Sequence, residues 1–129
     1  MRITSVQLEI KDRPKAENIE EALQLVDNAP HSDLIMLPEI WTVGFFSFDR
    51  YRDESETVSG PLVSALRDKA IEKACYLHTG SFVEKEGDNY YNTSLLLSPQ
   101  GEVAARYRKI HLFGYQSQER QILTAGDTI

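Results

Sequence analysis

The sequence DLIMLPE, from Asp33 to Glu39, places a carboxylate at the end of a short apolar run. Its apolar run ends at Leu37 and is bounded by residues that favour turns, a pattern typical of a strand covered on both faces. Pro38 ends the run, and Glu39 follows it directly. The stretch therefore predicts a buried strand with a carboxylate at its carboxyl end.

The segments on either side of this strand have strand-like and helix-like patterns. Residues 3–10 alternate as a half-buried strand does, with the even-numbered residues on the side expected to be buried. One helix is predicted to begin at Pro14 and to end within residues 28–30, and another to begin at residues 59–61 and to end near Cys75. The residues expected to face inward are Ala16, Ile19, Leu23 and Val26 in the first helix, and Leu62, Val63, Leu66, Ala70 and Ala74 in the second.

Three further runs, at residues 77–85, 90–98 and 103–109, have the composition of strands. The turn-forming sequences EGDN and SPQG separate them, which predicts an antiparallel meander. The whole order of strand, helix, strand, helix and three strands indicates an α/β fold with a mixed sheet, covered by helices on one face. At 129 residues, the chain fits one domain.

Acidic residues outnumber basic ones by 20 to 14, which gives a net charge of -6 at pH 7. This is the wrong sign to attract nucleic acid or anionic lipid headgroups, so we expect neither a nucleic-acid partner nor a membrane partner. The N-terminal apolar segment is too short and too interrupted by charge for a secretory signal, and no apolar stretch approaches the ~20 residues of a membrane span. Together with the single cysteine, these features predict a cytoplasmic protein.

Glu39 is the first candidate for chemistry. If the strand continues through Pro38, Glu39 stays in phase with Ile35 and Leu37 on an apolar face. Burial there would raise the pKa of the carboxyl group and make it a usable proton acceptor near neutral pH. The alternative is an acid at a strand end that reaches solvent or caps a backbone amide.

Lys109 is the second candidate. In the run at residues 103–109 it shares a face with Val103, Ala105 and Tyr107, whereas Arg106 and Arg108 fall on the other face. A cation on an apolar face needs an anion, which is either a carboxylate partner or a developing oxyanion. The alternative is a basic surface cluster from which the lysine extends into solvent.

Glu119 and Cys75 carry weaker signals. Glu119 alone would be a solvated acid in a loop or helix. Cys75 lies at a helix C-terminus, where the helix dipole disfavours a thiolate, so we expect a small buried residue rather than a nucleophile. The histidines have no ligand spacing, and we assign no metal.

Taken together, the LPE of residues 37–39, the YNTSLLLSPQGEVAARYRKIHLF of residues 91–113 and the acid before LTAGD resemble the nitrilase superfamily of carbon-nitrogen hydrolases. Trp41 and Gly44 add to the match, which covers nearly the whole chain. The resemblance implies that the chain is the N-terminal part of an α-β-β-α four-layer sandwich with a catalytic Glu-Lys-Cys set.

By this resemblance, Glu39 is similar to the general base of the family and Lys109 to the cation that stabilises the tetrahedral intermediate. Glu119 is similar to an additional glutamate that positions substrate. The implied reaction is attack by a thiol on a small amide or nitrile, followed by hydrolysis of a thioester. The resemblance thus implies an enzyme that cleaves carbon-nitrogen bonds other than peptide bonds and needs no cofactor.

The chain departs from the family in one respect. The nucleophilic cysteine of the family lies C-terminal to the lysine and the second glutamate, whereas Cys75 precedes both. We therefore expect residues 1–129 to be an incomplete carbon-nitrogen hydrolase domain, part of a longer protein and inactive alone. Unpaired strand edges and an uncovered apolar face predict association with a partner, and the family implies a homo-oligomer.

Two functions stay open. The first is part of an amidase-type hydrolase, ω-amidase-like, that acts on a dicarboxylic monoamide. The second is a non-catalytic descendant that binds a small molecule or a partner through a pocket between Glu39 and Lys109. The reading frame beyond Ile129 distinguishes the two functions. A cysteine in the family motif would support the enzyme, and a stop codon would support the binding protein. An unrelated acidic α/β domain would not explain the ordered set of motifs.

Overall fold

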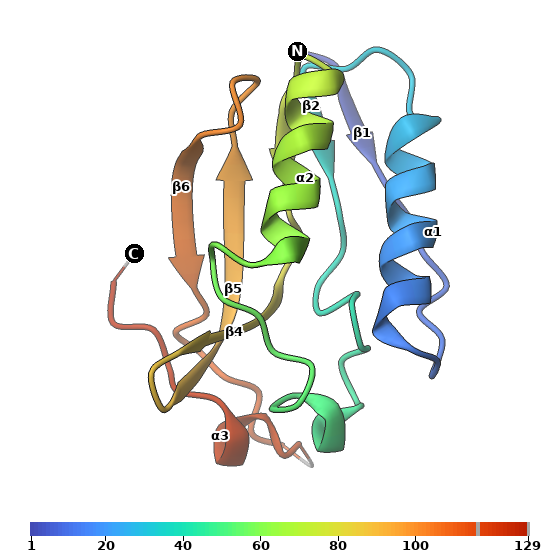
Figure 1. The fold of residues 1–129 in the computed structure, drawn as a ribbon. Helices are drawn as coiled ribbons and strands as arrows, with labels where there is room; N and C mark the ends of the chain where they lie inside the picture. The colour runs from blue at the N-terminus through green and yellow to red at the C-terminus, as the bar shows by residue number, and fades with distance from the viewer. Residues whose placement is uncertain (116, 129) are drawn as a thin grey trace.

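The computed structural model describes residues 1–115 and 117–128. It contains two long helices, one short helix, a 3-10 helix and a sheet of six strands (Figure 1). In chain order the elements are β1 (Ile3–Ser5), α1 (Lys15–Asp27), β2 (Leu34–Met36), η1 (Phe48–Arg50), α2 (Pro61–Glu72), β3 (Tyr76–His78), β4 (Phe82–Glu86), β5 (Asn89–Leu97), β6 (Val103–Arg108) and α3 (Glu119–Ile122). This order confirms the α/β class predicted from the sequence.

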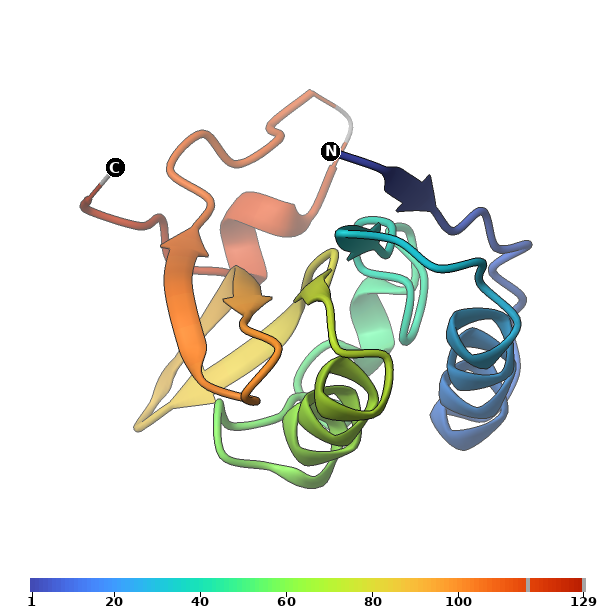
Figure 2. The ribbon, with the colours of Figure 1, turned by 90° about the horizontal axis from the view of Figure 1, so that it is seen from above.

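The sheet is mixed. Strands β1, β2 and β3 are parallel neighbours, and β5 joins β3 in the antiparallel sense. The long strand β5 also pairs with β4 and, along its other edge, with β6, so the meander predicted for the second half of the chain is present. Figure 2 shows α1 and α2 side by side over one face of this sheet, which confirms the predicted helical layer.

The predicted strand at residues 77–85 is in fact two strands, β3 and β4. The break falls at Gly80, whose φ of +64° belongs to the left-handed region that favours glycine. A side chain there would overlap the carbonyl oxygen of Pro38, because the two backbones run in close contact. The break therefore brings the end of β3 against the loop that follows β2.

The predicted strand at residues 3–10 is also shorter than expected, since β1 ends at Ser5. Beyond Val6, whose N–H donates to the carbonyl oxygen of Met36 at 2.9 Å, the neighbouring strand β2 has ended. The predicted alternation nevertheless holds. Val6 is buried, and Leu8 and Ile10 pack against the core.

For two residues, the predicted position on the inward face of a helix is wrong. Ala16 lies exposed in the first turn of α1, whose buried positions are Asn18, Ala22 and Val26. Ala74 lies beyond the end of α2 with a φ of +49°, where the chain reverses before β3, and is exposed. The hydrophobic pattern continued past the point at which the helix ends.

The two faces of the sheet differ in burial. On the helical face, Ile35, Leu77 and Leu97 are fully buried beneath α1 and α2. On the opposite face, Leu34, Tyr76 and Leu96 line an open apolar hollow of about 300 Å³. The prediction that the strand of residues 33–37 is covered on both faces therefore holds only for the helical side. Within the described residues, no helix is long and apolar enough to cross a bilayer.

Gly80 gives a test of this architecture. Gly80→Ala is expected to lower the free energy of unfolding by roughly 3 kcal/mol or more, because a methyl group adds backbone overlap to the strain of a positive φ. Gly87 is the matched control, with a φ of +59° but nothing within 4 Å of an added Cβ. Gly87→Ala should therefore lose only about 1 kcal/mol in urea unfolding. Equal losses in the two variants would contradict the close contact at Gly80.

Candidate active site

The loop after β2 holds Glu39 at the edge of the sheet. The N–H of Ile40 donates to the Ser81 hydroxyl at 3.1 Å, and the N–H of Ser81 donates to the carbonyl oxygen of Pro38 at 3.1 Å. Ile40 has a φ of +45°, a strained conformation for a β-branched residue. The backbone on both sides of Glu39 is thus fixed against the β3–β4 junction.

Lys109 directly follows β6 and is held by backbone hydrogen bonds on both sides. Its N–H donates to the carbonyl oxygen of Asn92 at 2.9 Å, and its carbonyl oxygen accepts from the N–H of Gly126 at 3.0 Å. The predicted facing of this strand is confirmed, since Arg106 and Arg108 both bind the buried carboxylate of Glu84 on the other side of the sheet. Lys109 is therefore free to extend toward Glu39.

Glu119 opens the short helix α3 and is completely buried, so its interpretation as a solvated acid is wrong. The N–H of Phe113 donates to its Oε2 at 2.6 Å. The apolar residues Leu112 and Leu123 flank it in the sequence and belong to a buried cluster with Ile40, Val43 and Tyr51. A segment without helical or strand periodicity thus folds over the carboxylate.

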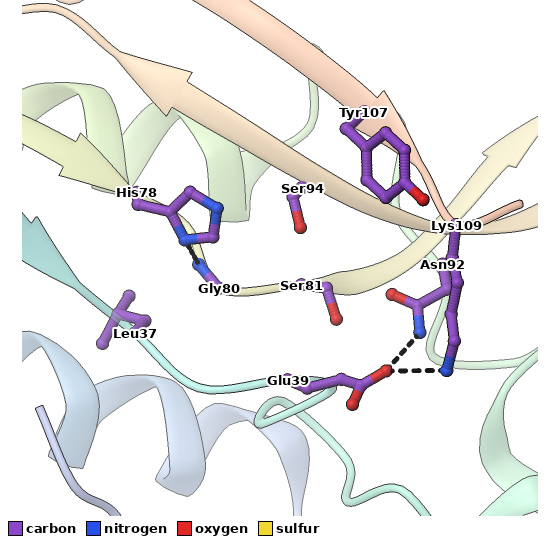
Figure 3. Close-up of a pocket in the computed structure, with 9 residues that line it drawn as sticks. All are labelled: Leu37, Glu39, His78, Gly80, Ser81, Asn92, Ser94, Tyr107 and Lys109. Atoms are coloured by element: carbon purple, nitrogen blue, oxygen red, sulfur yellow. Dashed lines mark hydrogen bonds and ion pairs between the residues drawn. The ribbon is translucent and has the colours of Figure 1, made fainter. Parts of the chain in front are cut away.

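The carboxylates of Glu39 and Glu119 both accept hydrogen bonds from the ammonium group of Lys109. Lys109 Nζ lies 3.0 Å from Glu39 Oε1, 3.2 Å from Glu119 Oε1 and 3.3 Å from Glu119 Oε2. Figure 3 shows Glu39 and Lys109 pointing toward each other among the residues that line a pocket of about 190 Å³. The pocket is lined by Leu37, Glu39, His78, Gly80, Ser81, Asn92, Ser94, Tyr107 and Lys109. The structure therefore brings together all three candidate residues.

The electrostatics of the site favour a charged lysine. Partial burial opposes the ammonium form of Lys109, but its hydrogen bonds to Glu39 and Glu119 outweigh this and raise its pKa above the ordinary value. Nearby, burial raises the pKa of Tyr51 far above its usual range, and the charges of Glu119 and Glu39 act in the same direction. At neutral pH, the site thus holds a charged ammonium group and a neutral phenol.

Glu39 does not lie in the environment expected from the sequence. Its side chain is 51% exposed, so the predicted burial is wrong. The reason is that β2 ends at Met36: Ile35 and Leu37 pack in the core, while the loop turns Glu39 toward the pocket. Among the described residues, none donates a hydrogen bond to Oε2 of Glu39, whereas Oε1 accepts from both Asn92 and Lys109.

Two residues of the site were not identified from the sequence. Asn92 contacts both carboxylates, and the ring of Phe45 lies 5.3 Å from Lys109 Nζ, close enough for a cation–π contact. The sequence does contain one signal for Asn92, since asparagine is disfavoured inside strands and this one lies within the predicted strand of residues 90–98. Phe45 belongs to an aromatic segment without periodicity, and nothing in the sequence distinguishes it from its neighbours.

Cys75 lies apart from the pocket. It is buried in the apolar core beneath the helices, and burial raises the pKa of its thiol. This confirms the prediction of a small buried residue. In residues 1–115 and 117–128, no group of three or more His, Cys, Asp or Glu side chains could hold a metal ion.

Comparison with known proteins gives one family. The model of the carbon-nitrogen hydrolase family matches residues 2–129. A 2-oxoglutaramate amidase of Paenarthrobacter nicotinovorans is 35% identical over 115 residues, which cover 86% of this chain and 39% of the relative. The chain thus spans well under half the length of that relative.

Solved structures agree. XC1258 from Xanthomonas campestris, a CN-hydrolase superfamily protein with an arsenic adduct in its active site, superposes with a TM-score of 0.87 at 30% identity, over 98% of this chain and 46% of that one. A mutant amidase from Nesterenkonia sp. AN1 in complex with butyramide gives a TM-score of 0.83 at 25% identity, over 99% and 49%. The fold described above therefore matches about half of each of these proteins.

The shared ammonium group predicts a specific pH dependence of stability. A lysine with a raised pKa stabilises the fold fully below its unfolded-state value of 10.5, and this contribution is lost as the pH rises through the folded-state pKa. Lys109→Met should therefore be roughly 2 to 4 kcal/mol less stable than the unsubstituted chain near pH 8, because Glu119 is left buried without its cation. The difference should shrink above the pKa of the lysine.

The control is Lys11→Met. Lys11 pairs with Glu9 at 3.4 Å, and both side chains are largely exposed. An exposed pair contributes only about 0 to 1 kcal/mol, so little change is expected. Urea unfolding across this pH range measures both variants. A Lys109→Met difference as small as that of the control, or independent of pH, would contradict the pairing.

Proposed function

Because the chain belongs to the carbon-nitrogen hydrolase family, we propose that it supplies the proton acceptor and the oxyanion-stabilising cation of an amidase whose nucleophilic cysteine lies outside these 129 residues. The observation that carries the proposal is the ammonium group of Lys109, placed between Glu39 and Glu119 at the edge of a pocket. The substrate class is a small non-peptide amide.

In this proposal, Glu39 is the general base. Its Oε2 takes the proton of the incoming thiol, and the thiolate attacks the amide carbon. The carbon–nitrogen bond then breaks as Glu39 returns the proton to the leaving nitrogen, which departs as ammonia or an amine. A water molecule, deprotonated by the same carboxylate, hydrolyses the thioester and releases the acid and the thiol.

Lys109 stabilises the negative oxygen of the two tetrahedral intermediates. Its raised pKa supports this role over that of a base, since the side chain keeps its proton at neutral pH. It is already held by two carboxylates, so little reorganisation is needed when charge develops on the substrate. A fixed donor of this kind typically contributes about 10² to 10³ in rate.

Glu119 has a different role in the proposal. Both of its oxygens accept hydrogen bonds, Oε1 from Lys109 and Asn92 and Oε2 from Lys109 and the backbone of Phe113. A carboxylate occupied in this way is a poor proton acceptor. It serves to hold Lys109 in place and thereby to position the substrate oxygen that the ammonium group contacts.

For the substrate, we propose an ω-amidase-like activity on the monoamide of a dicarboxylic acid. The name of the Paenarthrobacter relative, a 2-oxoglutaramate amidase, supports this class. The pocket volume of about 190 Å³ supports a small substrate, although residues outside this chain would complete its walls. We also propose that the whole protein is a cytoplasmic homo-oligomer. Its substrates are small amides or nitriles, and it needs no cofactor.

The proposal predicts that the 129-residue chain releases no ammonia from the monoamide of glutaric acid, because a base and a cation cannot form an acyl-enzyme without a thiol. Cys75→Ala should behave in the same way, since the buried thiol takes no part. An ammonia assay with each protein tests this. Hydrolysis by the chain that persists in Cys75→Ala would refute the thiol mechanism altogether.

In a longer protein that contains this chain and a nucleophilic cysteine, Glu39→Gln should lower kcat by about 10² to 10⁴, the usual contribution of a general base. Glu9→Gln is the control, since that carboxylate is exposed and does not line the pocket, so kcat should be unchanged. A longer protein that binds the monoamide but never releases ammonia would favour the non-catalytic binding protein instead.

A further inference from the structure

Asn92, in the middle of β5, contacts all three residues of the candidate site. Its Nδ2 donates to Glu39 Oε1 at 2.9 Å and to Glu119 Oε1 at 3.2 Å. Its backbone oxygen accepts the N–H of Lys109 at 2.9 Å. The residue is only 3% exposed and is anchored on its other side by pairing with Val83 in β4. It therefore links three segments that are distant in the sequence.

The chemistry of this position calls for a neutral donor. Glu39 and Glu119 carry two negative charges, and Lys109 carries one positive charge. A carboxylate in place of Asn92 would repel both acids, and an ammonium group would cancel the negative charge that a base needs to attract a proton. One carboxamide nitrogen has two hydrogens, so it can satisfy both carboxylates without changing the charge of the site.

The two contacts on Glu39 fall on the same oxygen. Figure 3 shows the dashed lines from Asn92 and Lys109 converging on Oε1. Two donors that approach one oxygen from different elements, β5 and the end of β6, restrict rotation of the carboxylate more than one donor would. The orientation of the other oxygen, Oε2, follows from this restriction.

We infer that Asn92 is the positioning residue of the site, which ties both carboxylates to one ammonium group and leaves Oε2 of Glu39, among the described residues, as the oxygen without a hydrogen-bond donor. The inference rests on the proposed function. Without Asn92, the carboxylate of Glu39 can rotate about its last torsion, and the repulsion between Glu39 and Glu119 is offset by Lys109 alone. Proton transfer then slows, whereas the pocket that binds substrate keeps its shape.

A first experiment uses the 129-residue chain and needs no activity. In an NMR titration with acid that follows the carboxyl carbons of Glu39 and Glu119, the side-chain N–H signals of Asn92 should shift together with those carbons, because its Nδ2 donates to both carboxylates. His78 lines the same pocket and burial lowers its pKa, so the titration is repeated in His78→Gln to remove its contribution, whereas the raised pKa values of Lys109 and Tyr51 keep both groups protonated throughout. Asn92→Asp removes the signal and assigns it.

Asn18 is the internal control. It is equally buried, at 3%, but its Nδ2 donates to the carbonyl oxygens of Thr42 and Lys11 at 3.0 and 3.3 Å. Its side-chain signals should therefore not follow the carboxylates of the site. Asn92 signals that stay constant while Glu39 and Glu119 titrate would overturn the inference.

A second experiment measures kinetics in the longer protein that contains this chain. Asn92→Asp should lower kcat about 10²-fold, the loss typical of a misplaced catalytic group, with KM changed less than about threefold. The acidic limb of the pH–rate profile should move to higher pH, because three clustered carboxylates do not all stay ionised. Asn18→Asp should leave both kcat and the profile unchanged.

The two experiments separate the inference from the proposed function. A longer protein that hydrolyses no amide with Asn92 intact contradicts the proposed function, and the NMR titration still decides whether Asn92 ties the carboxylates together. If the longer protein is active and Asn92→Asp has the same kcat and pH–rate profile as Asn18→Asp, the inference about Asn92 is overturned. The proposed function is then unaffected.

Discussion

A single ammonium group, that of Lys109, must neutralise a completely buried carboxylate and a half-exposed one. Burying a charged carboxylate without a partner is costly, so Glu119 can lie under the loops only because Lys109 reaches it. The same ammonium group binds Glu39, which is 70 residues away along the chain. The loop after β2, the end of β6 and α3 are thereby held at one edge of the sheet.

The backbone around this ion cluster is fixed by contacts of its own, apart from those between the side chains. Gly80 lets the β3–β4 junction lie against the loop that carries Glu39, and Asn92 on β5 holds the main chain of Lys109. Both features belong to a sheet that is buried on its helical face and open on the other. The pocket lies on the open face, where a second layer of the family fold would cover it in our proposal.

The sequence predicted those parts of the fold that depend on local periodicity. The helices beginning near Pro14 and Pro61, the buried strand ending before Pro38 and the meander after Cys75 all followed from hydrophobic spacing and turn residues. The opposite facing of Lys109 and Arg108 followed from strand alternation. The joint order of motifs, rather than any one of them, indicated the family.

What the sequence could not predict depends on contacts between distant segments. The break at Gly80 exists because another backbone passes beside it, and nothing within residues 77–85 indicates that neighbour. Glu119 looks like a surface acid because its cation is ten residues earlier, on a different element. The exposure of Glu39 has a similar cause, since the loop turns where β2 ends rather than continuing in phase.

In the proposed mechanism, Glu39 and Lys109 serve a thiol outside this chain. Acid quenching of the longer protein with a dicarboxylic monoamide, followed by peptide mass spectrometry, locates the trapped acyl group directly. The proposed mechanism predicts a thioester on a cysteine beyond these residues, formed far more slowly in Glu39→Gln. An acyl group on Cys75, or equal rates of acylation with and without the Glu39 carboxylate, would contradict it.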